Sequence, residues 1–182
     1  MIIIYGKSGS GKDLFAELLV QENPSLHIMK RPTTRPKRDG GDVSHYDYLS
    51  KEEWCTNTKI KYDTVFRGWN YGVYDDSLLD NKGVLIIDGK TAHKIKHDNP
   101  NIILIEIKAN DDVRLNRCYN RECYNEQAMI EAKRRLIADN IDYSKLPSAD
   151  INVENSRNNI LFKELKNEVK RVNTLLEDKY GI

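Results

Sequence analysis

Four short apolar runs interrupt a chain that is otherwise mixed in polarity. Three of them are continuous rather than alternating and are rich in isoleucine, valine and leucine, which is typical of strands buried on both faces of a parallel sheet. The fourth, at residues 151–153, has an asparagine at its centre and is a weaker strand pattern. The runs predict strands at residues 2–5, 84–87, 102–105 and 151–153. Apolar residues at helical spacing follow the first run, at Leu14, Phe15, Leu18 and Leu19. Helices are also expected at residues 91–97 and 160–176.

The alternation of strand and helix predicts the α/β class, with a parallel sheet flanked by helices. Two stretches of the chain do not show this alternation of strand and helix. Residues 31–80 hold short strand-like pieces, and residues 112–143 have a helical pattern with many arginines. We interpret both as insertions into a single domain of residues 1–182, with its core at 1–30, 81–111 and 144–182. Ligands of such folds bind at the carboxyl ends of the strands.

Composition excludes several classes of protein. The chain has 182 residues, of which 39% are hydrophobic and 31% charged, and its net charge of +1 gives no field for nucleic acid. No apolar run is long enough for a signal segment or a membrane span. Three cysteines without paired spacing argue against a disulfide framework or a zinc site. A cytoplasmic protein without membrane or nucleic-acid partners is expected, as a monomer or a homodimer.

A glycine-rich loop directly follows the first predicted strand and precedes the first helix. Its pattern is Gly, four residues, Gly-Lys, which is that of a phosphate-binding P-loop in the strand–loop–helix context that the motif requires. Backbone N–H groups of such a loop bind phosphate oxygens, and the helix start adds its positive end. We expect it to bind ATP through Gly6, Ser8, Gly9, Ser10, Gly11, Lys12 and Asp13.

Two carboxylates are candidates for the metal side of this site. Asp13 stands where P-loops usually carry a Ser or Thr that binds Mg²⁺. It is either a Mg²⁺ ligand or a carboxylate favoured at the helix start by the helix dipole. Asp88 ends the run 84–87, as an acidic residue near metal or acceptor would. Mg²⁺ is therefore the expected cofactor beside ATP.

Residues 31–42 form an unusually basic segment, with prolines and two glycines. Arginine side chains match phosphate oxygens geometrically, so the segment is a candidate for binding a phosphorylated acceptor. A solvated basic loop is the alternative. Tyr46 and Tyr48 follow shortly afterwards, and we expect one of them to point inward.

These residues carry a resemblance to guanylate kinases. The sequence Thr33-Thr34-Arg35, then Arg38, then residues 46–54 is similar to the acceptor-binding signature of that family, and residues 68–72 are similar to its Gly-Asn-x-Tyr-Gly. The resemblance extends from Met1 to about Asn155. It implies a P-loop NTPase core with an acceptor-binding insertion at residues 31–80 and a helical lid at residues 112–143. It also implies acceptor-phosphate contacts from Arg35, Arg38, Tyr46 and Tyr71, an acidic residue near the acceptor at Asp88, and transferring-phosphate contacts from Arg117, Arg121 and Arg135.

The chain departs from the family where the base is read. Arg31 and Val73 replace serines, and Tyr62 or Asp63 replaces a glutamate. Asp63 and Asp88 can accept hydrogen bonds from a guanine, and Arg31 can donate one. Asp13 and Arg31 together resemble ribose 1,5-bisphosphate phosphokinases of the same fold.

Three functions follow from these residues. The first is a nucleoside monophosphate kinase that transfers a phosphate from ATP to GMP, dGMP or a related nucleotide. The second is a kinase for another phosphorylated acceptor, such as another or modified deoxynucleotide or ribose 1,5-bisphosphate. The third is a binding module of the guanylate kinase fold without catalysis, against which the intact Lys12 and the lid arginines argue.

Overall fold

A five-stranded parallel sheet forms the centre of the molecule in a computed structural model, which describes residues 1–37, 45–66, 68–120, 126–156 and 161–182. Its order is β2-β7-β1-β8-β9, and every neighbouring pair is parallel. The strands are β1 (Ile2–Tyr5), β2 (His27–Ile28), β7 (Gly83–Ile86), β8 (Ile103–Lys108) and β9 (Ile151–Glu154). Central β1 is buried at every residue, as its unbroken apolar run predicts. The predicted α/β class is confirmed.

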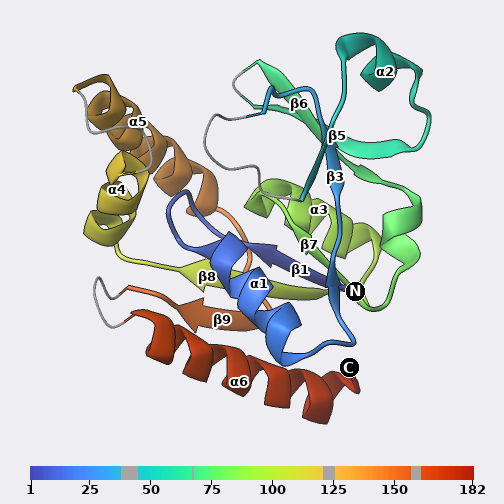
Figure 1. Ribbon diagram of the computed structural model, residues 1–182, viewed down its shortest axis with the longest axis vertical. Coiled ribbons are helices and arrows are strands. Elements are labelled where there is room, and N and C mark those ends of the chain that lie inside the picture. The colour runs from blue at the N-terminus through green and yellow to red at the C-terminus, as the bar shows by residue number, and fades with distance from the viewer. Residues whose placement is uncertain (38–44, 67, 121–125, 157–160) are drawn as a thin grey trace.

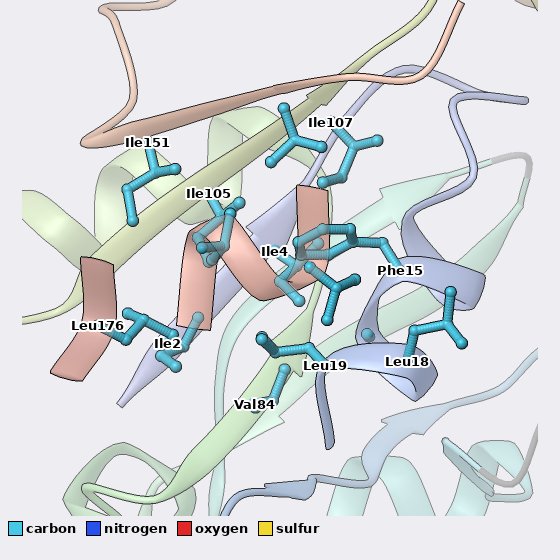
Figure 2. Close-up of a cluster of buried hydrophobic side chains, with 14 of the residues drawn as sticks. Ile2, Ile4, Phe15, Leu18, Leu19, Val84, Ile105, Ile107, Ile151 and Leu176 are labelled. Carbon is cyan, nitrogen blue, oxygen red and sulfur yellow. The ribbon is translucent and has the colours of Figure 1, made fainter. Parts of the chain in front are cut away.

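Helices cover both faces of this sheet. On one face, α1 (Lys12–Glu22) packs beside α6 (Leu161–Tyr180), and their apolar residues meet Ile2 and Ile4 in the core that Figure 2 shows. On the other face, α3 (Gly89–Asp98) packs through Ala92 and Ile95 against Ile3. The two-sided burial accounts for strands without a polar face.

A second, four-stranded sheet lies within residues 31–80, with the order β4-β3-β6-β5 (Figure 1). It consists of β3 (Arg31–Thr33), β4 (Tyr46–Tyr48), β5 (Ile60–Phe66) and β6 (Trp69–Tyr74). A short helix, α2 (Lys51–Thr56), begins in a capping box between Ser50 and Glu53. A 3₁₀ turn, η1 (Asp76–Leu79), leads back to the main sheet. Val73 of β6 is buried in the core on the α3 side, so the second sheet is anchored there.

The arginine-rich stretch forms two helices, α4 (Asp111–Asn120) and α5 (Glu126–Tyr143). They stand beside the end of the main sheet at which β1 leads into the glycine-rich loop (Figure 1). The second sheet stands on the other side of the molecule in the same view. The residues that the sequence assigns to the phosphate loop therefore lie close to α4 and α5.

Candidate functional site

The glycine-rich loop connects β1 to α1 in a conformation that requires glycine. Gly9 and Gly11 have φ values of 77° and 91°, in the left-handed region that L side chains rarely adopt. At Gly6 the constraint is space, because a Cβ atom there would lie 2.4 Å from the carbonyl oxygen of Ile107 on β8. Gly11 is the N-cap of α1, and no side chain caps that end of the helix. The positive end of α1 therefore adjoins the loop, as an anion site requires.

Lys12 and Asp13 are the first two residues of α1, and both are half-buried. The position of Asp13 in the first turn agrees with a favourable interaction with the helix dipole. It also suits a ligand of nucleotide-borne Mg²⁺, which takes only one or two carboxylates from the protein. Within the described ranges no group of three metal-ligating side chains is found. Both readings of Asp13 thus remain compatible with its place.

An ion pair between α4 and α5 holds the two peptide groups that flank Ser8. Arg114 of α4 donates from Nε to the Ser8 carbonyl oxygen at 3.0 Å. The N–H group of Ser8 donates to Oδ2 of Asp139, on α5, at 2.6 Å. The same carboxylate oxygen lies 2.9 Å from the Arg114 guanidinium, whose side chain is 1% exposed. The loop is therefore fixed at Ser8 from outside its own segment.

Lys7 extends this network toward the surface. Its Nζ donates to Oδ1 of Asn140 at 2.7 Å, and Asn140 also accepts from Arg114 at 3.1 Å. The Asn140 amide donates to Asp111, which pairs with Arg114 as well. A cavity of about 590 Å³ opens beside Lys7 and Asn140, between α5 and the ends of β8 and β9.

The middle of the loop is held by a second pair of residues. Arg117 donates to the carbonyl oxygens of Gly9 at 3.2 Å and Ser10 at 3.4 Å. Asn155, which directly follows β9, donates to the Ser10 carbonyl at 2.8 Å and accepts from Arg117. Burial lowers the pKa of the Arg117 guanidinium from its ordinary value. Of the three lid arginines predicted to contact phosphate, Arg117 thus lies at the loop.

The other two arginines predicted to contact the transferring phosphate are Arg135 and Arg121, and Arg134 is a neighbour of the first. Arg135 is buried and donates from Nε to Glu131 at 2.9 Å, one helical turn earlier on α5. Arg134 binds the same carboxylate through two nitrogens and is largely exposed. Arg121 lies outside the described residues.

Arginines and tyrosines of the second sheet form a cluster. Arg31 of β3 donates to the hydroxyl of Tyr46, and its guanidinium carbon lies 4.5 Å from the Tyr46 ring centroid. The Arg35 guanidinium carbon lies 5.0 Å from the same centroid. Tyr71 of β6 meets Tyr46 edge to face at 6.3 Å, and Arg35 donates to Tyr48 at 3.4 Å. The structure thus brings together four of the predicted acceptor residues, Arg31, Arg35, Tyr46 and Tyr71. Arg38 lies outside the described ranges.

The cluster carries positive charge that no described residue neutralises. Within the described part of the chain, neither Arg31 nor Arg35 has a carboxylate partner. The Nε atom of Arg35 is buried, and among the described residues it has no hydrogen-bond acceptor. A buried donor without an acceptor is costly unless a ligand supplies one. Two uncompensated guanidinium groups beside phenol hydroxyls suit a dianion.

Local hydrogen bonds fix the turn that presents Arg35. The Thr33 hydroxyl donates to the Asn70 carbonyl at 2.8 Å and accepts from the Arg35 N–H at 3.1 Å. The Thr34 hydroxyl accepts from the Asn70 N–H at 2.8 Å. The two threonines therefore join the basic segment to β6, which accounts for their presence before the arginine.

Asp88 and Asp63 have different surroundings. Asp88 caps α3, accepting from the Thr91 N–H at 2.9 Å, and it lies at the carboxyl end of β7, next to β1. Burial, with the charge of Asp88 adding to it, raises the pKa of Tyr143 on α5. Asp63 is exposed in the irregular part of β5, after Tyr62, whose φ is 49°. The structure thus puts Asp88, and not Asp63, at the edge of the main sheet where the loop begins.

The chain is similar in sequence to several guanylate kinases. The guanylate kinase of Helicobacter hepaticus is 30% identical over 134 residues, 67% of this chain and 66% of the relative. That of Gloeobacter violaceus is 29% identical over 117 residues, 59% of this chain and 57% of the relative. The crystal structure of guanylate kinase from Anaplasma phagocytophilum has a TM-score of 0.66 at 19% identity and covers 100% of this chain and 95% of that one. No family model matches the sequence.

The chain is a divergent member of the guanylate kinase family. The resemblance read from the signature residues is confirmed, and the solved structure shares the fold. The chain spans about two thirds or less of the length of these two curated relatives. In the described part of this guanylate kinase family member, no helix is both long and apolar enough to cross a membrane.

The sequence did not predict the residues from other segments that contact the glycine-rich loop of this guanylate kinase family member. They are Arg114, Asp139, Asn140 and Asn155. Arg114 is one of five arginines in a helical stretch, but nothing in the spacing distinguishes it from Arg134, which is largely exposed. Asp139 and Asn140 carry no motif at all.

Proposed function

We propose that the chain transfers the γ-phosphate of ATP to GMP, dGMP or a related nucleoside monophosphate, giving ADP and the diphosphate. The observation that carries the proposal is the uncompensated Arg31–Arg35–Tyr46–Tyr71 cluster, in a chain whose glycine-rich loop has the form of a triphosphate site. The names of the curated relatives support this choice of acceptor.

Each residue has a role in the proposed reaction. Lys12 binds the β- and γ-phosphates together with the loop residues Gly6, Ser8, Gly9, Ser10 and Gly11. Ser10 acts through its backbone, because its side chain is fully buried. Mg²⁺, held by Asp13 on the protein side, would neutralise charge on the phosphate oxygens.

On the acceptor side, Arg31, Arg35, Arg38, Tyr46 and Tyr71 bind the acceptor phosphate, and Asp63 and Asp88 are the proposed hydrogen-bond acceptors for the base. We assign residues 31–80 to acceptor binding and 112–143 to the lid. Arg117, Arg121 and Arg135 stabilise the equatorial oxygens during in-line transfer. Arg135 must exchange Glu131 for phosphate to do so.

A second acceptor class is favoured by one observation. Arg31 stands in the cluster beside Arg35, and this second guanidinium adds charge at the phosphate site. An acceptor with more phosphate, such as ribose 1,5-bisphosphate, would use that charge. A binding module without catalysis is the third candidate.

An ADP-release assay with Mg²⁺ and ATP separates the three candidates. The acceptors are GMP, dGMP, the other nucleoside monophosphates and ribose 1,5-bisphosphate, each with the unmodified protein and with Lys12→Ala. Release that depends on GMP or dGMP and is lost in Lys12→Ala is the expected result. Release with ribose bisphosphate alone supports the second class. If none of the acceptors causes ADP release, both kinase proposals are refuted.

A variant of the cluster tests the acceptor site itself. Arg35→Lys keeps the charge but removes the planar fork, so the acceptor KM should rise about tenfold to a hundredfold, as for loss of a hydrogen bond to a charged group. The ATP KM should not change. Lys30→Arg is the matched control, since Lys30 directly precedes the same strand and pairs at the surface with Asp47 at 3.6 Å. An equal acceptor KM in both variants would place the acceptor elsewhere.

A further inference from the structure

One ion pair satisfies both backbone polar groups of Ser8. Arg114 donates to its carbonyl oxygen at 3.0 Å, and its N–H group donates to Asp139 at 2.6 Å. The two partners come from different helices, α4 and α5, and lie more than a hundred residues away in sequence. The two peptide groups that flank Ser8 therefore cannot rotate without breaking a hydrogen bond to this ion pair.

The ion pair is almost completely shielded from solvent. The side chains of Arg114 and Asp139 are 1% and 15% exposed. Taking two charges from water is costly, and the pair is tolerated only where further hydrogen bonds satisfy its remaining donors and acceptors. Two of these bonds go to the Ser8 backbone, and others go to Asp111 and Asn140. The backbone of the loop therefore supplies two of the hydrogen bonds that the buried ion pair requires.

The contact continues into the next residue of the loop. A Cβ atom on Gly9 would lie 2.7 Å from the Arg114 carbonyl oxygen, so the backbones of α4 and the loop are in direct contact. Loop and helix thus fit against each other at two successive residues.

We propose that Arg114 and Asp139 are positioning residues for the phosphate donor. Acting through Ser8, they hold the loop in its anion-binding shape before ATP arrives and join it to α4 and α5. The inference rests on the proposal that this loop binds ATP. Preorganisation of this kind raises affinity because the loop need not be ordered on binding. Donor affinity thus depends on a carboxylate that does not itself touch the phosphates.

The test is isothermal titration calorimetry of ATP with Mg²⁺ on the Asp139→Asn variant. The amide keeps the shape but loses the charge, so the hydrogen bonds to Ser8 and Arg114 weaken to those of a neutral group. The Kd for ATP should rise about tenfold. Asp142→Asn is the matched control, because Asp142 lies on the same helix in an exposed pair with Lys90, away from the loop. Its Kd should stay within about twofold, the spread expected for a surface pair.

The outcomes distinguish positioning from a purely structural role. A structural role alone lowers the melting temperature and leaves the Kd of the folded protein unchanged, and that result overturns the inference. If Asp139→Asn does not fold, the Asn140→Ala variant replaces it, because Asn140 is only half-buried and its loss disturbs the fold less. This variant should raise the Kd for ATP about threefold. An unchanged Kd there also overturns the inference. An unmodified protein that binds no ATP refutes the proposed function as well, whereas a failed acceptor panel leaves the Kd comparison intact.

Discussion

Replacing Gly9 with alanine should destabilise the protein more than replacing Gly68, although both glycines have nearly the same backbone conformation. Their φ values are 77° and 79°. A Cβ atom on Gly9 would lie 2.7 Å from the carbonyl oxygen of Arg114 and 3.1 Å from the sulfur of Cys118, whereas one on Gly68 would meet nothing within 4 Å. The pair separates the cost of the left-handed conformation from the cost of the contact.

The two costs can be estimated separately. An alanine in the left-handed region costs about 1–2 kcal/mol, and the reduced freedom of the unfolded chain returns about 0.4–1 kcal/mol. Gly68→Ala should therefore lose about 1 kcal/mol. Gly9→Ala adds overlap with backbone atoms that cannot swing aside, for which overpacking costs of about 1–3 kcal/mol are typical. Its total should be about 2–4 kcal/mol.

Urea denaturation followed by circular dichroism measures the difference. Each kcal/mol corresponds to about 2–4 °C in melting temperature for a chain of this size, so thermal unfolding gives a second measurement. Equal losses in the two variants would refute the reasoning, because they would mean that the loop moves away from α4 without cost. A loss in Gly9→Ala that exceeds the Gly68→Ala loss supports the close contact.

Three further predictions concern stability. Leu176→Ala removes a fully buried side chain of α6 and should cost about 2–5 kcal/mol in urea unfolding. Ser50→Ala removes the N-cap of α2 and should cost about 1 kcal/mol by the same measurement, with Thr56→Ala, whose hydroxyl bonds only to its own helix, as control. Burial lowers the pKa of His93 below its ordinary 6.5, so the unfolded chain takes up the proton first on acidification. The melting temperature should fall between about pH 7.5 and 5.5, and should fall less in His93→Gln; an equal fall would assign the dependence to other groups.

The main sheet was predictable because a strand buried on both faces is a continuous apolar run, which can be recognised within a few residues. Residues 2–5 and 102–105 are continuous apolar runs, and both fall on strands. The strand β2 was missed, since His27–Ile28 has two residues, one of them exposed, and presents no period to detect. It is a strand only because β7 offers it a free edge.

The resemblance singled out Arg35, Tyr46 and Tyr71, but it did not predict how these side chains are arranged. The pairing of Arg31 with Tyr46 depends on the parallel register of β3 and β4, and that of Thr33 with Tyr71 on the antiparallel register of β3 and β6. Register between strands far apart in sequence is set by tertiary packing, which single-residue patterns do not contain. The same limit applies to α4 and α5, because the sequence pattern does not distinguish Arg114 from Arg134, although their side chains are 1% and 53% exposed.

The net charge of the chain is close to zero, but its arginines have two different kinds of surroundings. On α4 and α5, Arg114 and Arg135 are paired with carboxylates, which neutralise them and fix their direction. In the second sheet, Arg31 and Arg35 lie against phenol rings instead. An aromatic face attracts a guanidinium and orients it but does not cancel its charge. The Arg114–Asp139 pair holds the glycine-rich loop, whereas the guanidinium groups of the second sheet have no carboxylate partner among the described residues. This difference, rather than the number of basic residues, is our reason for proposing that the second sheet binds the acceptor.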